Sequence, residues 1–387
     1  MTFRKALLVP LLLAATLPWP AAAQKTYFAY GDSITAGLGD DPSLPLEEAG
    51  YPARLQELLE NAGRPEKVEN FGLGAEDTSE GIFRIEVVFP VTRPGDVMMI
   101  MEGTNDISRG ISPETTAFNL NTMAGKCRRE GLDVIHATVI PRLPNARVDE
   151  NNLITQQTNG LIRNLAGIQN RPLVDPFEMF TQQTDLFDRL YSDIPDDPVG
   201  HPNPAGYDLL AQTFFNVLIG VDDVPPVTGV VRPANGSRGI RPSALLEVEV
   251  WDFGTGIDLG ATELLVNGEV VPATITGDPR QIRITYQPER PWRGAVSVGL
   301  RSQDLAGPPN AVDREISRFR IAGSTLLDGD LNEDGRVDGT DLVLLGIRFG
   351  AIQGNRRYER RADFNQDGII NGDDLAILAS NFGRASF

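Results

Sequence analysis

The chain has 387 residues, carries a formal net charge of −18 and contains one cysteine, Cys127. At roughly 100 to 200 residues per domain, this length predicts two or three domains, with a sizeable hydrophobic core in at least one of them. The negative charge argues against nucleic-acid phosphate or anionic lipid as the main partner. The single cysteine excludes an internal disulfide and argues against a cysteine-based zinc site.

The first 23 residues have the layout of a secretory signal. Two basic residues precede an apolar centre at positions 6–17, and small residues follow up to Ala23. The apolar centre is too short to predict a membrane span. We therefore expect cleavage near Ala23 and a secreted or extracellular mature chain that begins near Gln24 and has no membrane span.

Residues 24–222 alternate short apolar runs with amphipathic segments. The expected strands are Tyr27–Tyr30, Lys67–Phe71, Val97–Met101 and Val134–Ile140, and the expected helices include Tyr51–Ala62, Pro113–Glu130, Asn151–Ile168 and Pro204–Ile219. This alternation predicts an α/β domain in which helices cover both faces of a parallel sheet. Ligands of such sheets bind at the carboxyl ends of the strands. Ser33, the 72–77 loop and Asn105 follow predicted strands, so we expect them at that edge.

Three short motifs occur along this segment. They are Gly31-Asp32-Ser33, Gly103-Thr104-Asn105-Asp106 and the stretch from His201 to Tyr207. As a set, and over residues 26–220, they resemble the GDSL (SGNH) hydrolase family of secreted esterase-like and lipase-like enzymes. The resemblance implies a three-layer, flavodoxin-like fold. It also implies ester hydrolysis with Ser33 as the nucleophile that accepts the acyl group.

The chain offers two histidines for the general base that a serine nucleophile requires. His136 lies inside an apolar run, which predicts a packed strand residue. His201 stands in a loop rich in Pro, Asn and Gly ahead of a predicted helix. We therefore assign the base to His201.

A carboxylate should orient His201. The family usually places this acid three residues before the histidine, where the present chain has Pro198. Asp197 lies one residue further away and is our choice, because a loop can absorb one extra residue. Asp196 and Asp193 remain alternatives, as does a dyad whose histidine is oriented by a backbone carbonyl.

The family resemblance also implies donors for the oxyanion that develops during acyl transfer. They are the backbone N–H of Ser33, the side-chain amide of Asn105 and a third donor in the 70–77 block. The family's glycine in that block falls at Gly74 or at the next residue, Ala75. A backbone N–H survives the replacement of glycine by alanine, so the donor is expected at either position.

After residue 222 the pattern changes to alternating apolar and polar residues. The expected strands are Leu245–Trp251, Glu263–Val266, Ile282–Tyr286 and Ala295–Leu300, separated by turns such as Asn267-Gly268. The pattern predicts an all-β sandwich over residues 223–322. With its turns at 252–258 and 304–307, this segment resembles a bacterial immunoglobulin-like module, and we expect it to act as a spacer.

The last segment contains two copies of one acidic pattern, at 330–341 and 363–374. The first copy consists of Asp330, Asn332, Asp334, Arg336, Asp338 and Asp341, and the second of Asp363, Asn365, Asp367, Ile369, Asn371 and Asp374. Each copy places oxygen ligands at loop positions 1, 3, 5, 9 and 12, glycine at position 6 and a backbone carbonyl at position 7. This set suits calcium. We expect two structural calcium ions and no cofactor for catalysis.

A single predicted helix follows each acidic loop, and position 12 is Asp where an EF-hand carries Glu. The pair resembles a dockerin module over residues 323–387, a small α domain that docks onto a cohesin. The resemblance therefore implies a cohesin-like protein partner. Gly339-Thr340 and Gly372-Asp373 differ from the Ser/Thr pairs common in cellulosomal dockerins, which leaves the identity of that partner open.

These features together predict a secreted, modular serine ester hydrolase. Its substrate would be an ester, with an acetyl or similar group on a glycan as the first hypothesis and lysophospholipid or simple acyl esters as alternatives. A hypothesis of a different class is a non-catalytic, calcium-dependent adhesion or assembly protein. The joint presence of Ser33, Asn105 and His201 favours the enzyme.

Overall fold

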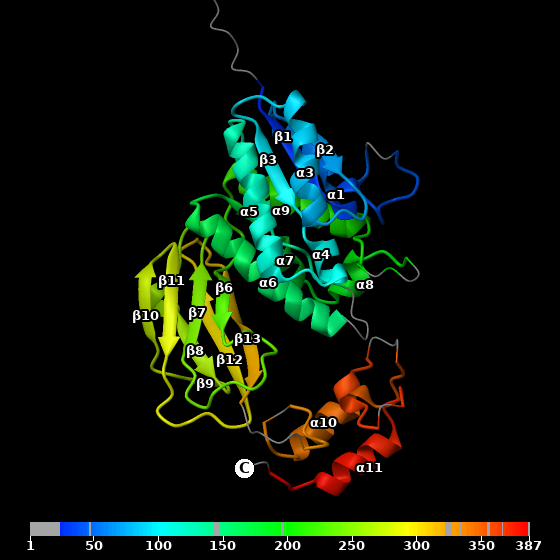
Figure 1. Ribbon diagram of the computed structural model, residues 1–387, viewed down its shortest axis with the longest axis vertical. Coiled ribbons are helices and arrows are strands. Elements are labelled where there is room, and N and C mark those ends of the chain that lie inside the picture. The colour runs from blue at the N-terminus through cyan, green and yellow to red at the C-terminus, as the bar shows by residue number, and fades with distance from the viewer. Residues whose placement is uncertain are drawn as a thin grey trace, which may run out of the picture.

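The computed structural model describes residues 24–45, 48–142, 148–194, 197, 199–321, 327–332, 334–353, 357–365 and 367–385. The predicted signal segment, Asp196 and the predicted boundary at residues 322 and 323 lie outside these residues. Figure 1 shows an α/β region, an all-β region and a small helical region in chain order. Among the described residues, helices that combine enough length and apolar character to span a bilayer are absent.

The first region is built on a parallel sheet. Its strands are β1 (Thr26–Gly31), β2 (Lys67–Gly72), β3 (Val97–Met101), β4 (Asp133–Ala137) and β5 (Leu173–Val174). They lie in the order β2-β1-β3-β4-β5, and every neighbouring pair is parallel. All residues of β3 are buried, as expected for a strand that is covered on both faces. The predicted α/β class with a parallel sheet is confirmed.

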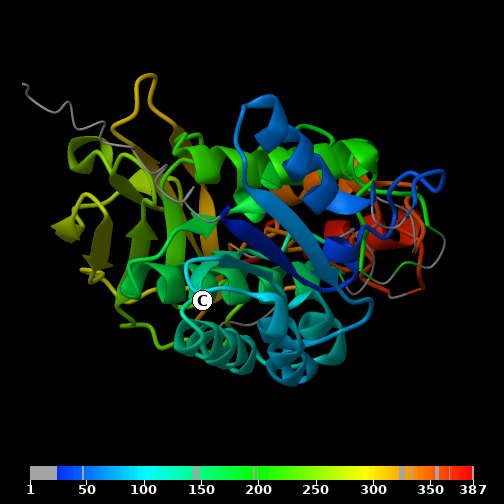
Figure 2. The ribbon, with the colours of Figure 1, turned by 90° about the horizontal axis from the view of Figure 1, so that it is seen from above.

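Helices cover both faces of this sheet, as Figure 2 shows from above. They are α1 (Ser33–Ala36), α2 (Gly50–Asn61), α3 (Thr78–Val88), α4 (Thr104–Arg109), α5 (Pro113–Arg129), α6 (Val148–Ile168), α7 (Pro176–Thr181), α8 (Leu186–Leu190) and α9 (Pro204–Ile219), with a 3-10 turn η2 (Phe89–Val91). Alternation along β1 divides the core into two halves. Ala29 packs in the half that contains residues of α2 and α9, and Tyr30 in the half formed with α3, α5 and α6.

The strand order reverses between β1 and β3. The chain passes from β1 to β2 on one side and then returns to form β3 on the other side of β1. In open α/β sheets the ligand site lies outside the carboxyl ends of the strands at such a reversal. Ser33 follows β1 directly, and Asn105 lies at the start of α4 shortly after β3.

Residues 227–320 form two antiparallel sheets in the part of the chain that the structure describes. One contains β10 (Thr274–Asp278), β11 (Gln281–Tyr286), β7 (Leu246–Trp251) and β6 (Val227–Arg232); the other contains β13 (Ala311–Arg320), β12 (Ala295–Gln303), β8 (Glu263–Val266) and β9 (Glu269–Val270), with η3 (Leu259–Ala261) between β7 and β8. One core joins Val248 and Ile282 of the first sheet with Leu264 and Val298 of the second. This pairing agrees with the all-β prediction.

The β region packs closely against α6. A side chain at Gly160 would meet the backbone oxygen of Gly229 at 2.6 Å, and a side chain at Gly167 would clash with the ring of Trp251. The indole Nε1 of Trp251 donates a hydrogen bond to Asn164 Oδ1 at 2.8 Å. The two glycines on α6 therefore allow the strands to approach the helix, and the β region is fixed to the first region rather than merely tethered to it.

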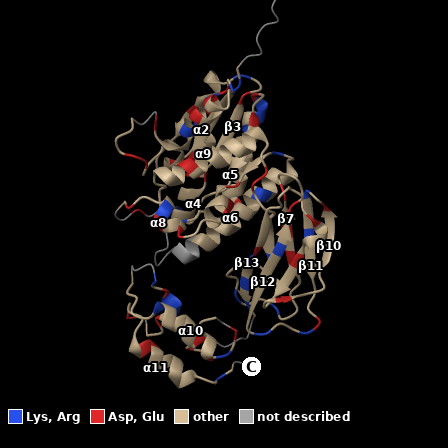
Figure 3. Ribbon diagram, turned by 180° about the vertical axis from the view of Figure 1, so that it is seen from behind, with Lys and Arg blue, Asp and Glu red and all other residues tan. Residues whose placement is uncertain are grey.

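The C-terminal region contains α10 (Gly339–Arg348) and α11 (Gly372–Asn381), with the 3-10 turn η4 (Arg360–Ala362). Each helix follows one of the two acidic loops, as predicted. Val337, Leu345, Ile370 and Leu378 belong to its small buried core. Figure 3 shows acidic and basic residues interspersed along all three regions.

Candidate active site

The turn from β1 into α1 presents Ser33 at the carboxyl edge of the sheet. Asp32 caps the helix, because its Oδ1 accepts a hydrogen bond from the N–H of Ile34 at 2.9 Å. Burial raises the pKa of the Asp32 carboxyl to about 6. Gly31 leaves no space for a side chain, since a Cβ there would clash with the backbone oxygen of Met101. Close packing and the cap therefore fix Ser33 at the strand end.

His201 lies within hydrogen-bonding distance of Ser33. Ser33 Oγ and His201 Nε2 are 2.8 Å apart, and His201 Nδ1 and Asp197 Oδ2 are also 2.8 Å apart. The carboxylate accepts two further hydrogen bonds, from the N–H of His201 at 2.8 Å and from the N–H of Val199 at 2.9 Å. Gly200 between them adopts φ 82°, a left-handed conformation that glycine tolerates. Side chains from the two ends of the domain thus form one hydrogen-bonded chain.

Among the aspartates considered for His201, Asp197 is the residue that contacts the imidazole. Asp193 is exposed, and Asp196 lies outside the described residues. Burial alone would raise the pKa of Asp197, but the hydrogen bonds from His201 and Val199 outweigh it and hold the pKa below its ordinary value. The ionised carboxylate at neutral pH favours the tautomer in which Nδ1 carries the proton and Nε2 faces Ser33 as an acceptor.

Asn105 lies in the first turn of α4 and is buried. Its Nδ2 donates a hydrogen bond to the backbone oxygen of Glu76 at 2.7 Å, which fixes the orientation of the amide and leaves one N–H for another acceptor. The next residue, Asp106, is fully buried and accepts hydrogen bonds from the N–H of Thr78 at 2.8 Å and from Thr116 Oγ1 at 2.9 Å. Asp106 therefore anchors α4 to α3 and α5.

The loop after β2 supplies the remaining donor candidates. Gly72 lies against α1, because a Cβ on it would clash with the backbone of Ala36. Gly74 has open space around it, whereas Ala75 adopts φ 64°, the left-handed conformation that favours glycine. Throughout the described residues, the N–H groups of Gly74, Ala75 and Ser33 have no hydrogen-bond acceptor. These N–H groups are therefore available to a ligand.

Arg142 is a residue at this edge that the sequence analysis did not single out. Its side chain is 1% exposed and donates hydrogen bonds to the backbone oxygen of Thr104 at 2.8 Å and to Ser108 Oγ at 2.7 Å. Burial lowers the pKa of Arg142, and the charges of Asp197 and Asp32 oppose this shift. The guanidinium thus braces α4 close to both carboxylates. Its position just beyond the carboxyl end of β4 was the available sequence signal.

The two acidic loops of the C-terminal region contain equivalent internal hydrogen bonds. One oxygen of Asp330 and one of Asp363 each accept a hydrogen bond from the glycine N–H of the same loop at 2.9 Å. Asp341 and Asp374 are fully buried and accept hydrogen bonds from backbone N–H groups of their loops. The remaining predicted ligands lie on the same turns: Asn332, Asp334, Arg336 and Asp338, and Asn365, Asp367, Ile369 and Asn371.

The donor set of these loops fits calcium, which takes carboxylate, amide and backbone oxygens. In the described part of the chain, Asp330 Oδ1 is buried without a hydrogen-bond partner. A buried carboxylate oxygen of this kind requires a cation or another partner.

Comparison with known proteins assigns two of the three regions. Residues 29–209 match the GDSL-like Lipase/Acylhydrolase family, and residues 328–382 match the dockerin type I domain. Residues 29–209 thus form a GDSL-like domain, and residues 328–382 form a dockerin type I domain. The predicted resemblances to these two families are confirmed, and a dockerin type I domain is a calcium-binding module.

The protein is similar to two curated esterases. It is 34% identical over 131 residues to Esterase TesA of Pseudomonas aeruginosa, which covers 34% of this chain and 62% of that protein. It is 27% identical over 128 residues to the Arylesterase of Vibrio mimicus, which covers 33% of this chain and 61% of that protein. The chain thus spans about three fifths of the length of each relative.

The acetylxylan esterase Axe2 from Geobacillus stearothermophilus is among the solved structures that the chain is similar to. The two chains share 21% sequence identity with a TM-score of 0.42, and the alignment covers 51% of this chain and 94% of that one.

Proposed function

We propose that the GDSL-like domain is a serine ester hydrolase that works through an acyl-enzyme on Ser33. The observation that carries this proposal is the hydrogen-bonded chain from Ser33 Oγ through His201 to Asp197, with both links at 2.8 Å. A nucleophile, a base and a group that orients the base are what acyl transfer requires. The two curated relatives, both named as esterases, support the same chemistry.

In the first half-reaction, Ser33 Oγ attacks the carbonyl carbon of the ester while His201 Nε2 takes the hydroxyl proton. The Asp197 carboxylate holds Nδ1–H and stabilises the imidazolium that forms. Collapse of the tetrahedral intermediate breaks the bond to the alcohol, and the imidazolium returns its proton to the leaving oxygen. The products of this half-reaction are the free alcohol and an ester of Ser33.

The negative charge on the carbonyl oxygen needs donors that are already in place. We assign this role to the N–H of Ser33, the remaining N–H of the Asn105 amide and the N–H of Ala75, with Gly74 as the alternative. The left-handed backbone at Ala75 and the Glu76 carbonyl that holds Asn105 support the assignment. Arg142 would act as a positioning residue, because it braces the α4 backbone next to Asn105.

In the second half-reaction, water takes the place of the alcohol. His201 accepts a proton from water as it attacks the acyl carbon, and the same donors hold the second oxyanion. Breakdown of this intermediate returns the proton to Ser33 Oγ and releases the carboxylic acid. The predicted calcium ligands belong to another part of the chain.

The other regions of the chain have proposed roles of their own. We propose that the chain divides into a signal peptide (1–23), the hydrolase domain (24–222), an immunoglobulin-like sandwich (223–322) and the dockerin domain (323–387). Each acidic loop would hold one calcium ion, which would supply folding energy, and the dockerin domain would bind a cohesin-like partner outside the cell. These features favour an acetyl or similar ester on a glycan as substrate, with lysophospholipid and simple acyl esters as alternatives.

A fluorophosphonate probe tests the nucleophile. Mass spectrometry should place the adduct on Ser33, and turnover of p-nitrophenyl acetate should fall by several orders of magnitude in Ser33→Ala. Ser79→Ala is the matched control, since Ser79 also lies at the start of a helix but bonds to Asp77. Labelling of a different serine would overturn the proposal. Turnover of acetylated xylan, short acyl esters and lysophospholipid by the same preparation would then rank the substrates.

A further inference from the structure

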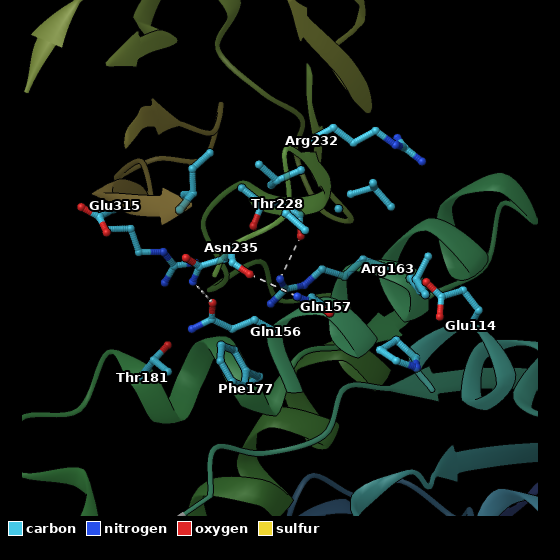
Figure 4. Close-up of a pocket in the computed structure, with 18 residues that line it drawn as sticks. Glu114, Gln156, Gln157, Arg163, Phe177, Thr181, Thr228, Arg232, Asn235 and Glu315 are labelled. Carbon is cyan, nitrogen blue, oxygen red and sulfur yellow. Dashed lines mark hydrogen bonds between the residues drawn. The ribbon is translucent and has the colours of Figure 1, made fainter. Parts of the chain in front are cut away.

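A second site is suggested by a cavity of about 480 Å³ between the hydrolase domain and the β region. Helices α6 and α7 line one side, and residues of β6 and β13 line the other (Figure 4). Ser33, Asn105 and His201 are not part of its lining. Small-molecule sites have this size and occur preferentially at domain interfaces.

Three amide side chains define the polar part of this cavity. Asn235 Nδ2 donates to Gln156 Oε1 at 2.9 Å, and Gln157 Nε2 donates to the backbone oxygen of Asn235 at 3.2 Å (Figure 4). Asn235 Oδ1 accepts a hydrogen bond from the N–H of Arg318 at 2.8 Å. Within the described residues, these bonds leave the amino group of Gln156 and the amide oxygen of Gln157 without protein partners. The cavity thus offers neighbouring donors and an acceptor in fixed positions.

Of the three arginines along the cavity, Arg163 and Arg314 have acidic partners, and Arg232 is exposed. Arg163 pairs with Asp175 at 2.7 Å, and Arg314 pairs with Glu178 at 2.5 Å. The net charge of the whole chain is −18. A phosphate or carboxylate ligand would therefore find no uncompensated cation at these two arginines and would be repelled by the protein as a whole.

Apolar side chains complete the lining, among them Leu161, Phe177 and Ile316. Phe177 lies next to Gln156 in Figure 4, so apolar and amide groups are neighbours in this lining. A long acyl chain would bury the amides without hydrogen-bond partners, which is unfavourable. A sugar ring matches the mixture, because its hydroxyl groups donate and accept while its C–H face packs against apolar side chains.

From size, hydrogen-bonding capacity and charge, we propose that this cavity binds an uncharged oligosaccharide. The free amino group of Gln156 and the free amide oxygen of Gln157 would bind neighbouring hydroxyl groups of one sugar. The β region would then contribute to glycan binding instead of serving only as a spacer. This site is separate from Ser33, so its existence does not depend on the proposed esterase activity.

Binding of xylotetraose to the full-length Ser33→Ala variant tests the proposal. Saturation-transfer NMR should detect the sugar, and isothermal titration should show about tenfold weaker binding after the shape-preserving change Gln156→Met with Gln157→Met. Gln212→Met is the control, because Gln212 lies exposed on α9 and pairs with Asn216. The control should bind as tightly as the parent. Unchanged circular dichroism would establish that the double variant folds.

Competition experiments separate the possible ligands and sites. Tetragalacturonate, which is anionic, and decanoate, which is apolar, should both fail to displace xylotetraose. Binding should also persist in wild-type protein whose nucleophile has been blocked by a fluorophosphonate. The proposal is wrong if the double variant binds like the parent, or if the blocked enzyme loses the sugar. If the double variant does not fold, Gln156→Met alone gives the decisive comparison, since it removes the amide hydrogens of a residue that lines the cavity.

Discussion

Acidic side chains in the hydrolase domain and in the dockerin domain differ in their hydrogen-bond partners. Two carboxylates of the hydrolase domain have ionisable side-chain partners: Asp197 bonds to His201, and Asp40 receives the guanidinium of Arg54 at 2.8 Å. In the dockerin loops, the buried carboxylates accept hydrogen bonds mainly from backbone N–H groups of their own turns, as Asp341 does. The counter-charge of Asp197 and Asp40 is therefore part of the sequence, whereas we expect that of the dockerin loops to come from an ion.

The two regions also differ in the size of their cores. The hydrolase domain has extensive apolar clusters on both faces of its sheet, whereas the described part of the dockerin domain has one small cluster around Val337 and Leu345. Small domains with little core commonly depend on a bound metal for their stability. We therefore expect calcium to control the folding of the dockerin domain and to leave the chemistry of the hydrolase domain unaffected.

Removal of calcium is the most direct way to break this comparison and should have the largest effect. With EDTA, the isolated segment 327–387 should lose its helical circular dichroism, because the clustered carboxylates repel one another without the ion. Turnover of p-nitrophenyl acetate by the full-length protein should not change. A calcium-independent spectrum would contradict the metal role, and loss of turnover in EDTA would link the metal to catalysis.

Asp197→Asn tests whether turnover by the hydrolase domain depends on the carboxylate that bonds to His201. Loss of the carboxylate that fixes the His201 tautomer should reduce kcat by about four orders of magnitude, the scale seen when a triad acid is replaced by its amide. Asp193→Asn is the matched control and should retain full turnover, because Asp193 is exposed. Small and equal losses in both variants would favour a dyad.

Asn105→Ala should have a smaller effect. If the amide donates to the oxyanion, the substitution should cost about 2.7 to 4 kcal/mol of transition-state stabilisation, seen in kcat with little change in KM. Asn119→Ala is the control for local packing, since Asn119 is also buried and bonds to Thr78 Oγ1 at 2.9 Å. A loss confined to KM, or an equal loss of kcat in both variants, would exclude the donor role.

The smallest predicted effect concerns His136 and the dependence of the free energy of unfolding on pH. Burial lowers the pKa of His136 to about 4, below its unfolded value of about 6.5, so the folded state binds fewer protons between these values. Its neutral form is fully compatible with folding above pH 6.5. As pH falls from 6.5 to 4, His136 should reduce the free energy of unfolding by a total of about 3 kcal/mol.

The variant His136→Leu isolates this contribution. Urea unfolding of parent and variant at several pH values should show that the parent loses more stability than the variant between pH 6.5 and 4. Their difference should be constant from pH 7 to 8. Parallel pH curves for the two proteins would show that His136 does not titrate in the expected way.

The parts of the fold that could be predicted from sequence are those with buried, uninterrupted patterns. β3 and α9 have the predicted bounds, because one is an all-buried apolar run and the other begins at Pro204 behind the Asn203 cap. The two-residue strand β5 was missed, since so short a segment has no period. β13 was also missed: its polar residues outnumber its apolar ones, and its partner β12 changes register at Val298 and Gly299.

At the candidate site, sequence patterns identified the side chains but not the backbone conformation of the loop after β2. The structure brings Ser33, Asp197 and His201 together as expected. It also shows that the left-handed residue of the loop after β2 is Ala75, which a search for glycine cannot reveal. Arg142 was missed because arginine in a loop is ordinarily a surface residue, and its burial depends on contacts with α4 that are distant in sequence.

The glycine-lined face of α6 has a consequence for module exchange. The backbone of Gly229 on β6 lies against Gly160, and the ring of Trp251 on β7 lies against Gly167. These two strands therefore cannot be grafted onto another protein unless its helix has small residues at both positions. Recombination near residue 222 would separate two surfaces that pack closely against each other. The hydrolase and β regions should therefore be inherited as one cassette.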